Sequence, residues 1–271
     1  DLVVEEGGVV KAFDYKSNDR TTYNYKNLVN AGIMIFSPSV FKYLTELRKY
    51  NYEKDIIVPL INEGKVVSYK SSEYAKDMGT PERYRRVQED YNSGICDAKN
   101  LANKQKAIFL DRDGTINEYV GFLRKEEDFR LIPGVSEAIK KINNSGYLAI
   151  VVTNQPVIAR GEVTEEELEE IHKKMETLLG LDGAYIDDIY YCPHHPDKGF
   201  EGEIPELKIE CDCRKPKTGM LEKAAREHNI DLSSSIMIGD STLDIKMAEN
   251  AGMQSVLLKT GQKGEDGKYE V

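Results

Sequence analysis

Residues 107–115 read AIFLDRDGT, and this stretch decides the fold. Its first four residues are apolar, which is the length of a short buried strand, and two carboxylates, Asp111 and Asp113, follow at once. Two carboxylates this close can share one task only if the backbone turns between them, and Gly114 permits that turn. The stretch therefore predicts a buried strand that ends in a reactive pair of carboxylates.

Strand and helix signals alternate through the rest of the second half of the chain. Apolar runs predict strands, and apolar residues at helical spacing predict helices; the strands are expected at 147–152, 189–191, 236–238 and 255–259, and the helices at 135–144, 164–179, 218–228 and 241–250. Thr164 and Glu167 have the spacing of a capping box. This alternation is typical of a parallel sheet with helices on both faces, whose ligands bind beyond the carboxyl ends of the strands. Asp111, Thr153 and Asp240 each follow a predicted strand, so we expect them at one crevice.

Composition divides the chain into two parts. The net charge is −10, and residues 1–100 carry as many basic as acidic side chains, so the excess of acid falls in residues 101–271. Ten of the 16 Tyr also lie in the first hundred residues. We expect two domains, 1–92 and 106–271, joined by a linker at 93–105. An acidic domain is a poor ligand for nucleic acid, and no apolar run approaches the ~18 residues of a membrane span.

The first half is less regular. Strands are predicted at 9–13, 31–36 and 66–69, and helices at 38–47, 54–61 and 81–92. The chain begins Asp1-Leu2-Val3-Val4, with no Met and no signal-like run, and we expect it to be a piece of a longer or processed polypeptide. Three of the four Cys lie between 192 and 213, a clustering that favours a reducing, cytoplasmic compartment over a disulfide framework.

The polar residues at the predicted strand ends fit phosphoester chemistry. Asp111 has the place of a carboxylate that attacks phosphorus, and Asp113 that of the group that handles protons. Thr153 and Asn154 are placed to donate hydrogen bonds to a phosphoryl group, and Lys215 to hold its charge. Carboxylates favour Mg²⁺, and two more of them follow the strand at 236–238: Asp240 and Asp244.

In this order the motifs resemble those of the haloacid dehalogenase-like phosphatases, over about residues 106–262. The resemblance implies a Rossmann-like sheet and a Mg²⁺-dependent reaction through an aspartyl-phosphate. It implies that Asp111 is the nucleophile and Asp113 the general acid and base, and that Thr153 and Lys215 stabilise the transferring phosphoryl group. Mg²⁺ would be held by Asp111, the backbone carbonyl of Asp113, and Asp240, and Asp244 would support that site without contacting the metal.

A second metal site is predicted in the irregular stretch 192–217. Cys-x-His and Cys-x-Cys pairs there supply three thiolates and one imidazole, which is the closed tetrahedral set of a structural zinc site: Cys192, His194, Cys211 and Cys213. His195 is the alternative imidazole, and the one-residue gap favours His194. A stretch of this length has no core of its own, so bound Zn²⁺ would supply its folding energy.

The runs DRDGTIN, IARG, CPHH, CDCRKPKTGM and GDSTLDI together narrow the resemblance to phosphatases that remove the 7-phosphate of D-glycero-D-manno-heptose 1,7-bisphosphate. That resemblance implies that Arg214 reads the substrate and that Tyr119 to Phe122, with Gln155 and Pro156, line the pocket. The chain departs from the pattern at Pro156 and Ser241, where Ser and Lys are frequent. Histidinol-phosphate phosphatases share the zinc loop and are the nearest alternative.

Residues 1–92 resemble the C-terminal part of sugar-1-phosphate nucleotidyltransferases, a partial α/β domain. The resemblance rests on Asn30-Ala31-Gly32-Ile33 and on Lys76-Asp77-Met78-Gly79-Thr80-Pro81. That family's glycine-rich nucleotide-binding loop is absent, so a fragment of a bifunctional nucleotidyltransferase and phosphatase is a further alternative. A non-catalytic, zinc-stapled binding module is a third. The sequence favours the phosphatase, acting on a small sugar phosphate.

Overall fold

The computed structural model describes residues 2–14 and 27–270, and the chain divides into two compact units, 1–71 and 72–271. The boundary therefore lies earlier than the one predicted at 92/93. Residues 93–105, predicted to be a linker, contain helix α3 (Ile95–Ala98), directly after α2 (Pro81–Asn92). Lys99 holds this stretch to the second unit, because its buried side chain donates a hydrogen bond of 2.8 Å from Nζ to the Tyr185 hydroxyl.

The second unit is built on a five-stranded parallel sheet with the strand order β5-β4-β3-β6-β7. The strands are β3 (Ala107–Leu110), β4 (Leu148–Asn154), β5 (Asp188–Cys192), β6 (Ile236–Gly239) and β7 (Gln254–Leu257). The change of direction beside β3 places the carboxyl ends of β3, β4 and β6 together. This is the switch point at which such sheets bind ligands. The predicted α/β fold is confirmed.

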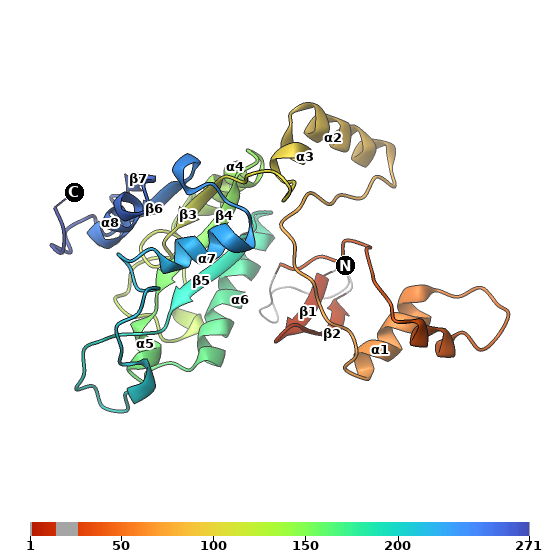
Figure 1. The fold of residues 1–271 in the computed structure, drawn as a ribbon, viewed down its shortest axis with the longest axis horizontal. Coiled ribbons are helices and arrows are strands. Elements are labelled where there is room, and N and C mark those ends of the chain that lie inside the picture. Colours follow the sequence, from red (N-terminus) through yellow and green to blue (C-terminus); the bar gives the residue numbers. More distant parts are fainter. Residues whose placement is uncertain (1, 15–26, 271) are drawn as a thin grey trace. The chain divides into compact units, whose positions relative to one another are not determined.

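Helices cover both faces of this sheet, as Figure 1 shows. Alternate residues of β3 separate the two cores: Ile108 packs with α4 (Val135–Asn143) and α6 (Glu165–Leu181), and Phe109 packs with α7 (Gly219–Glu227) and α8 (Thr242–Asn250). The central strands β3 and β4 are buried on both sides, which explains their unbroken apolar runs, whereas the edge strand β7 is exposed. The short helix α5 (Pro156–Ala159) follows β4 directly.

Local signals in the second unit match the structure closely. The capping box at Thr164 is present, with the Glu167 amide donating to the Thr164 hydroxyl and the Thr164 amide donating to the Glu167 carboxylate. Ser241 and Asp244 form a second capping box at the start of α8, which the sequence reading did not anticipate. Residues 193–217 form an irregular insert apart from one 3₁₀ turn at Pro205–Leu207.

The first unit contains the antiparallel strands β1 (Leu2–Glu6) and β2 (Val9–Asp14), followed by a 3₁₀ turn at Pro38–Tyr43, a π-helical turn at Glu53–Ile57 and helix α1 (Val58–Asn62). The strand predicted at 31–36 is wrong, because these residues are irregular and Ile35 is 99% exposed. The strand predicted at 66–69 is reduced to a single bridge between Val67 and Val9. An apolar run becomes a strand only where a neighbouring strand pairs with it.

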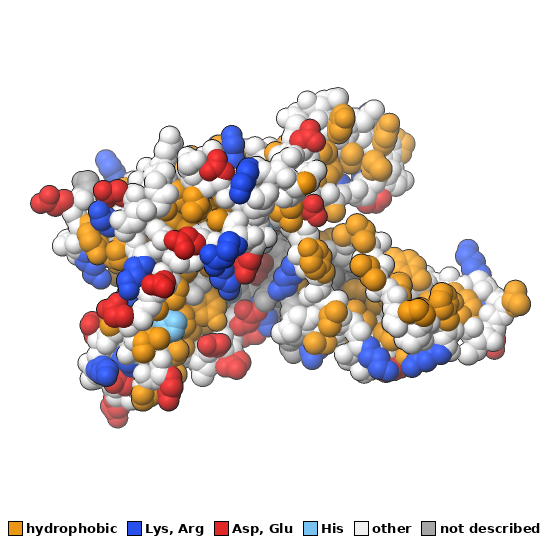
Figure 2. All heavy atoms as spheres, in the orientation of Figure 1, with side chains coloured by type: hydrophobic (Ala, Val, Ile, Leu, Met, Phe, Trp, Pro, Cys, Tyr) orange, Lys and Arg blue, Asp and Glu red, His pale blue; other side chains and the backbone are white. Residues whose placement is uncertain are grey.

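Acidic and basic side chains are interspersed over the second unit on the face drawn in Figure 2. Among the described residues, no helix is long and apolar enough to cross a membrane.

Candidate active site

Asp111 is the first residue after β3, and its carboxylate faces a buried lysine. Lys215 Nζ donates to Asp111 Oδ1 at 2.7 Å and to Asp244 Oδ1 at 2.6 Å, and the lysine side chain is only 3% exposed. Burial raises the pKa of Asp111 to about 7, against the opposing effect of the Lys215 charge. The site therefore holds a desolvated carboxylate beside a fixed cation, a suitable nucleophile for a phosphate ester.

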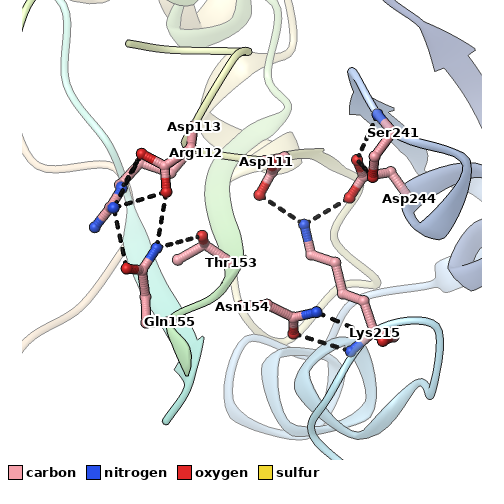
Figure 3. A network of polar contacts seen from close by, with 9 residues as sticks. All are labelled: Asp111, Arg112, Asp113, Thr153, Asn154, Gln155, Lys215, Ser241 and Asp244. Atoms are coloured by element: carbon pink, nitrogen blue, oxygen red, sulfur yellow. Dashed lines mark hydrogen bonds and ion pairs between the residues drawn. The ribbon is translucent and has the colours of Figure 1, made fainter. Parts of the chain in front are cut away.

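Asp113 turns away from Asp111, as Figure 3 shows. Arg112, which is completely buried, donates from Nη2 to Asp113 Oδ2 at 2.7 Å, and Asn117 and Gln155 each donate to the same carboxylate at 3.0 Å. Burial opposes ionisation here, but the Arg112 charge and these hydrogen bonds together lower the pKa of Asp113. In this arrangement Asp113 is held in its basic form.

The end of β4 supplies Thr153, Asn154 and Gln155. The Thr153 hydroxyl accepts a hydrogen bond of 2.9 Å from Gln155 Nε2, so its own proton is available to a phosphoryl oxygen. Asn154 differs from expectation. Its Oδ1 accepts from the backbone amide of Lys215 at 3.0 Å and its Nδ2 donates to the Lys215 carbonyl, so it holds the lysine backbone in place.

Two carboxylates follow β6, and they have different surroundings. Asp244 is saturated: Oδ1 accepts from Lys215, and Oδ2 accepts from the Ser241 hydroxyl at 2.6 Å and the Ser241 amide at 3.1 Å. Asp240 Oδ2 accepts from the Gln262 amide at 2.6 Å, but Asp240 Oδ1 is buried with no partner among the described residues. A buried, unpaired carboxylate oxygen is costly unless a cation completes it.

The carboxylates of Asp111, Asp240 and Asp244 offer oxygens that all lie within 4.8 Å of one another. Backbone approaches closely on the same side: a Cβ at Gly114 would lie 2.2 Å from Asp240 Oδ2, and Gly114 has a φ of +86° that favours glycine. The donors are hard oxygens and one of them is unpaired, so the residues present fit a divalent cation such as Mg²⁺.

A cavity of about 220 Å³ opens beside these groups. Its lining includes residues expected from the sequence: Asp111, Asp113, Tyr119, Phe122, Thr153, Asn154, Gln155, Arg214 and Lys215. It also includes Arg160, Gln262 and Lys268, to which the sequence analysis gave no role, and His195, which was considered there only as an alternative metal ligand. Arg160 stands in the IARG run, which had been noted only as a family signature.

The insert brings Cys192, His194, Cys211 and Cys213 together. Cys213 Sγ lies 3.1 Å from Cys192 Sγ, 3.3 Å from Cys211 Sγ and 3.2 Å from His194 Nδ1. All four ligand atoms lie within 4.8 Å of one another, a set that fits one metal ion. His195 is outside this set, and its amide donates to the Leu207 carbonyl.

Comparisons with known proteins agree with this geometry. Residues 212–270 match the Hydrolase_like family model, described as HAD-hydrolase-like. The D-glycero-beta-D-manno-heptose-1,7-bisphosphate 7-phosphatase of Haemophilus ducreyi is 44% identical over 160 residues, which cover 58% of this chain and 85% of the relative. A Photorhabdus laumondii protein named for the alpha substrate is also 44% identical, over 59% of this chain and 85% of its own length.

Among solved structures, the D,D-heptose 1,7-bisphosphate phosphatase of B. bronchiseptica, complexed with magnesium and phosphate, has a TM-score of 0.52 at 34% identity and covers 59% of this chain and 84% of its own. The chain belongs to the HAD-like phosphatases and is an enzyme that hydrolyses phosphate esters. The relatives compared above are both named as heptose-1,7-bisphosphate 7-phosphatases.

The contrast between Asp240 and Asp244 gives a first prediction. Because Asp240 carries the unpaired oxygen, Asp240→Asn should raise the Mg²⁺ concentration for half-maximal activity by about 10- to 100-fold. Asp244→Asn should instead lower kcat with little change in that concentration, since it releases Lys215. Metal titrations of phosphate release compare the two, and equal metal dependence in both variants would contradict the assignment.

Proposed function

We propose that this chain removes the 7-phosphate of D-glycero-D-manno-heptose 1,7-bisphosphate through an aspartyl-phosphate on Asp111. The observation that carries the proposal is the contact of 2.7 Å between Lys215 Nζ and Asp111 Oδ1, at the floor of a cavity that three further basic side chains line: Arg160, Arg214 and Lys268. A substrate with two phosphate groups suits a cavity that is cationic both at its floor and at its walls. The names of the relatives support this sugar.

In this proposal Asp111, the backbone carbonyl of Asp113 and Asp240 would hold Mg²⁺, which would supply positive charge to offset the negative charges of nucleophile and substrate. Lys215, fixed between Asp111 and Asp244, also faces the charge of the phosphoryl group. The Thr153 hydroxyl donates to a phosphoryl oxygen.

In the first chemical step, an oxygen of Asp111 forms a bond to phosphorus while the bond from phosphorus to the sugar oxygen breaks. Asp113 gives its proton to the departing sugar oxygen. Since Arg112, Asn117 and Gln155 favour the ionised form of Asp113, the proton must arrive with the substrate or from water as the cavity fills.

In the second step, water attacks the phosphorus of the aspartyl-phosphate, and its proton passes to Asp113. The arrangement seen here, with Asp113 ionised beside Gln155 and Thr153, suits this step. The bond between Asp111 and phosphorus breaks, inorganic phosphate leaves and the Asp111 carboxylate is restored.

We further propose Zn²⁺ as the metal of the Cys192, His194, Cys211 and Cys213 set, because three thiolates and one imidazole close a tetrahedron around it. Arg214 and Lys215 follow Cys213 directly, so this ion would fix where their backbone runs. Arg214 is already oriented this way, since its Nη1 donates to the His194 carbonyl at 3.1 Å.

Residues 1–92 we assign, as a separate proposal, to the C-terminal part of a sugar-1-phosphate nucleotidyltransferase-like domain. Such an activity would consume the heptose 1-phosphate that the phosphatase releases. Activity assays with a sugar 1-phosphate and a nucleoside triphosphate, on this chain and on any longer polypeptide that contains it, test this assignment.

Phosphate release from a panel of substrates tests the function. The panel holds both anomers of the heptose 1,7-bisphosphate, the 7-monophosphate and histidinol phosphate, each with and without Mg²⁺. We expect kcat/KM for a heptose bisphosphate to exceed that for histidinol phosphate by about 100-fold, because an unmatched cationic subsite is costly. The two anomers are both included because relatives of either name are equally identical. A preference for histidinol phosphate would overturn the proposal.

A further inference from the structure

The cavity wall formed by Arg160 has an unusual construction. The Arg160 guanidinium carbon lies 4.3 Å from the centre of the Phe122 ring and 4.4 Å from that of Phe200, so one planar cation stacks against two aromatic rings. Phe122 belongs to the loop after β3, whereas Phe200 belongs to the insert that carries the Cys and His cluster. Two separate parts of the fold therefore hold one arginine.

Arg160 has no anionic partner within the described ranges 2–14 and 27–270. Its Nε is buried and makes no hydrogen bond there, and no carboxylate forms an ion pair with it. Two of the other basic groups that line the cavity are engaged: Lys215 with Asp111 and Asp244, and Arg214 with the His194 carbonyl. Burying a hydrogen-bond donor without an acceptor costs folding free energy. An arginine whose orientation is already fixed by stacking loses little entropy when it binds an anion.

Position within the cavity indicates which anion. The reacting carboxylate, Asp111, already has its own cation in Lys215, and its side chain is 13% exposed at the cavity floor. Arg160 lines the cavity wall together with His195 and Arg214. A phosphate on this wall is one that is not being transferred.

We propose that Arg160 binds the non-transferred phosphate of the substrate, and that Phe200 is a positioning residue that orients it. This rests on the proposed function only in requiring a substrate with two phosphates. Phe200 is itself packed from the insert side, with its ring 6.0 Å from that of His195 and 4.6 Å from Lys208 Nζ. The folded insert therefore affects binding of the non-transferred phosphate through Phe200, which orients Arg160.

The test compares bisphosphates with their monophosphates in the 271-residue chain. Arg160→Ala should raise KM for a bisphosphate by about 10- to 100-fold, the range expected from losing a charged hydrogen bond, and leave kcat within about twofold. KM for the matching monophosphate should hardly change. Arg160→Lys keeps the charge but not the planar stack, so its KM for the bisphosphate should fall between those of the original chain and Arg160→Ala.

Phe200→Leu retains apolar volume but removes the ring, and should raise KM for the bisphosphate by about fivefold, with the same split between substrates. Arg124 is the matched control: it also approaches Phe122, at 6.0 Å, but it is paired with Glu162 at 2.7 Å and does not line the cavity. Arg124→Ala should leave both substrates unchanged. Thermal unfolding and the metal content of each variant report whether the insert remains folded.

Two results would overturn the inference: a KM for the bisphosphate within about twofold of the original in Arg160→Ala, or an equal rise for monophosphate and bisphosphate. The comparison uses every sugar for which both forms are at hand. If the heptose is not the preferred sugar, the proposed function fails while the ratio between bisphosphate and monophosphate still judges Arg160.

Discussion

Asp111→Asn eliminates phosphate release, with a fall in kcat on the order of 10⁴-fold or more, while the fold is retained. The amide has the shape of the carboxylate but does not attack phosphorus, and its oxygen still accepts the hydrogen bond from Lys215 Nζ. Initial rates at saturating substrate and Mg²⁺, with circular dichroism as a check on folding, measure this. A variant that keeps a tenth of the original kcat would contradict the assignment of Asp111 as nucleophile.

The same variant should be more stable than the original chain when both are free of metal. Burial raises the pKa of Asp111 from 3.8 to about 7, so the folded state holds this proton to a higher pH than the unfolded state does. The free energy of unfolding that this group contributes is therefore lost as pH rises through that window. An asparagine at position 111 does not ionise, so the variant avoids this loss of stability. Without metal at pH 7.5, its melting temperature should therefore be higher than that of the original chain.

Asp97 provides the control for this effect, because its side chain is exposed on α3. Asp97→Asn should leave the metal-free melting temperature at pH 7.5 unchanged. Saturating Mg²⁺ should reduce the difference in melting temperature between Asp111→Asn and the original chain, since a bound cation offsets the carboxylate charge. A metal-free Asp111→Asn protein that melts lower than the original at pH 7.5 would show that this carboxylate is stabilising.

Cys213→Ser is the second substitution with a large expected effect. Cys213 Sγ is close to each of the other three ligand atoms, so its loss should release the zinc, unfold the insert and lower kcat/KM by about 100-fold or more. Unfolding the insert should displace three side chains together, because Arg214, Lys215 and Phe200 all belong to it. Zinc content by mass spectrometry, melting temperature and phosphate release follow the change.

Cys96 offers the matched control, since it lies outside the cluster. Cys96→Ser should keep the zinc and the activity. Treating the original chain with a strong zinc chelator and then restoring excess Mg²⁺ should reproduce the Cys213→Ser phenotype. If zinc removal left folding and phosphate release intact, the insert would fold without a metal.

The catalytic edge of the sheet was predictable because it depends on local signals. Asp111, Thr153 and Asp240 end apolar runs, and parallel strands bring such ends together whatever the details of packing. The cysteine spacing likewise predicted the four side chains that the structure brings together, with His194 rather than His195 among them. Both predictions rest on short sequence patterns: the residue that follows an apolar run, and the spacing of Cys and His.

Other features depend on contacts between distant segments and have no local signal. The stacking of Arg160 requires Phe200, which is 40 residues away in an irregular insert. The anchoring of residues 260–269 onto the cavity is equally non-local: Thr260 donates to the Gly114 carbonyl at 2.6 Å, and Asp266 accepts from the Thr242 amide at 2.8 Å. In the first unit, the strand expected at 31–36 failed because pairing decides strands more than composition does.

The central claim is that Asp111 carries the phosphoryl group, and one measurement addresses it directly. Because Asp113 acts in both steps, the measurement uses the original chain: its reaction with a heptose bisphosphate is quenched in acid within one turnover, before water completes the second step. Peptide mass spectrometry should then find the mass of one phosphoryl group on Asp111. Phosphate release accompanied by a phosphoryl group on a different residue, or by none at any time in the turnover, would contradict the account.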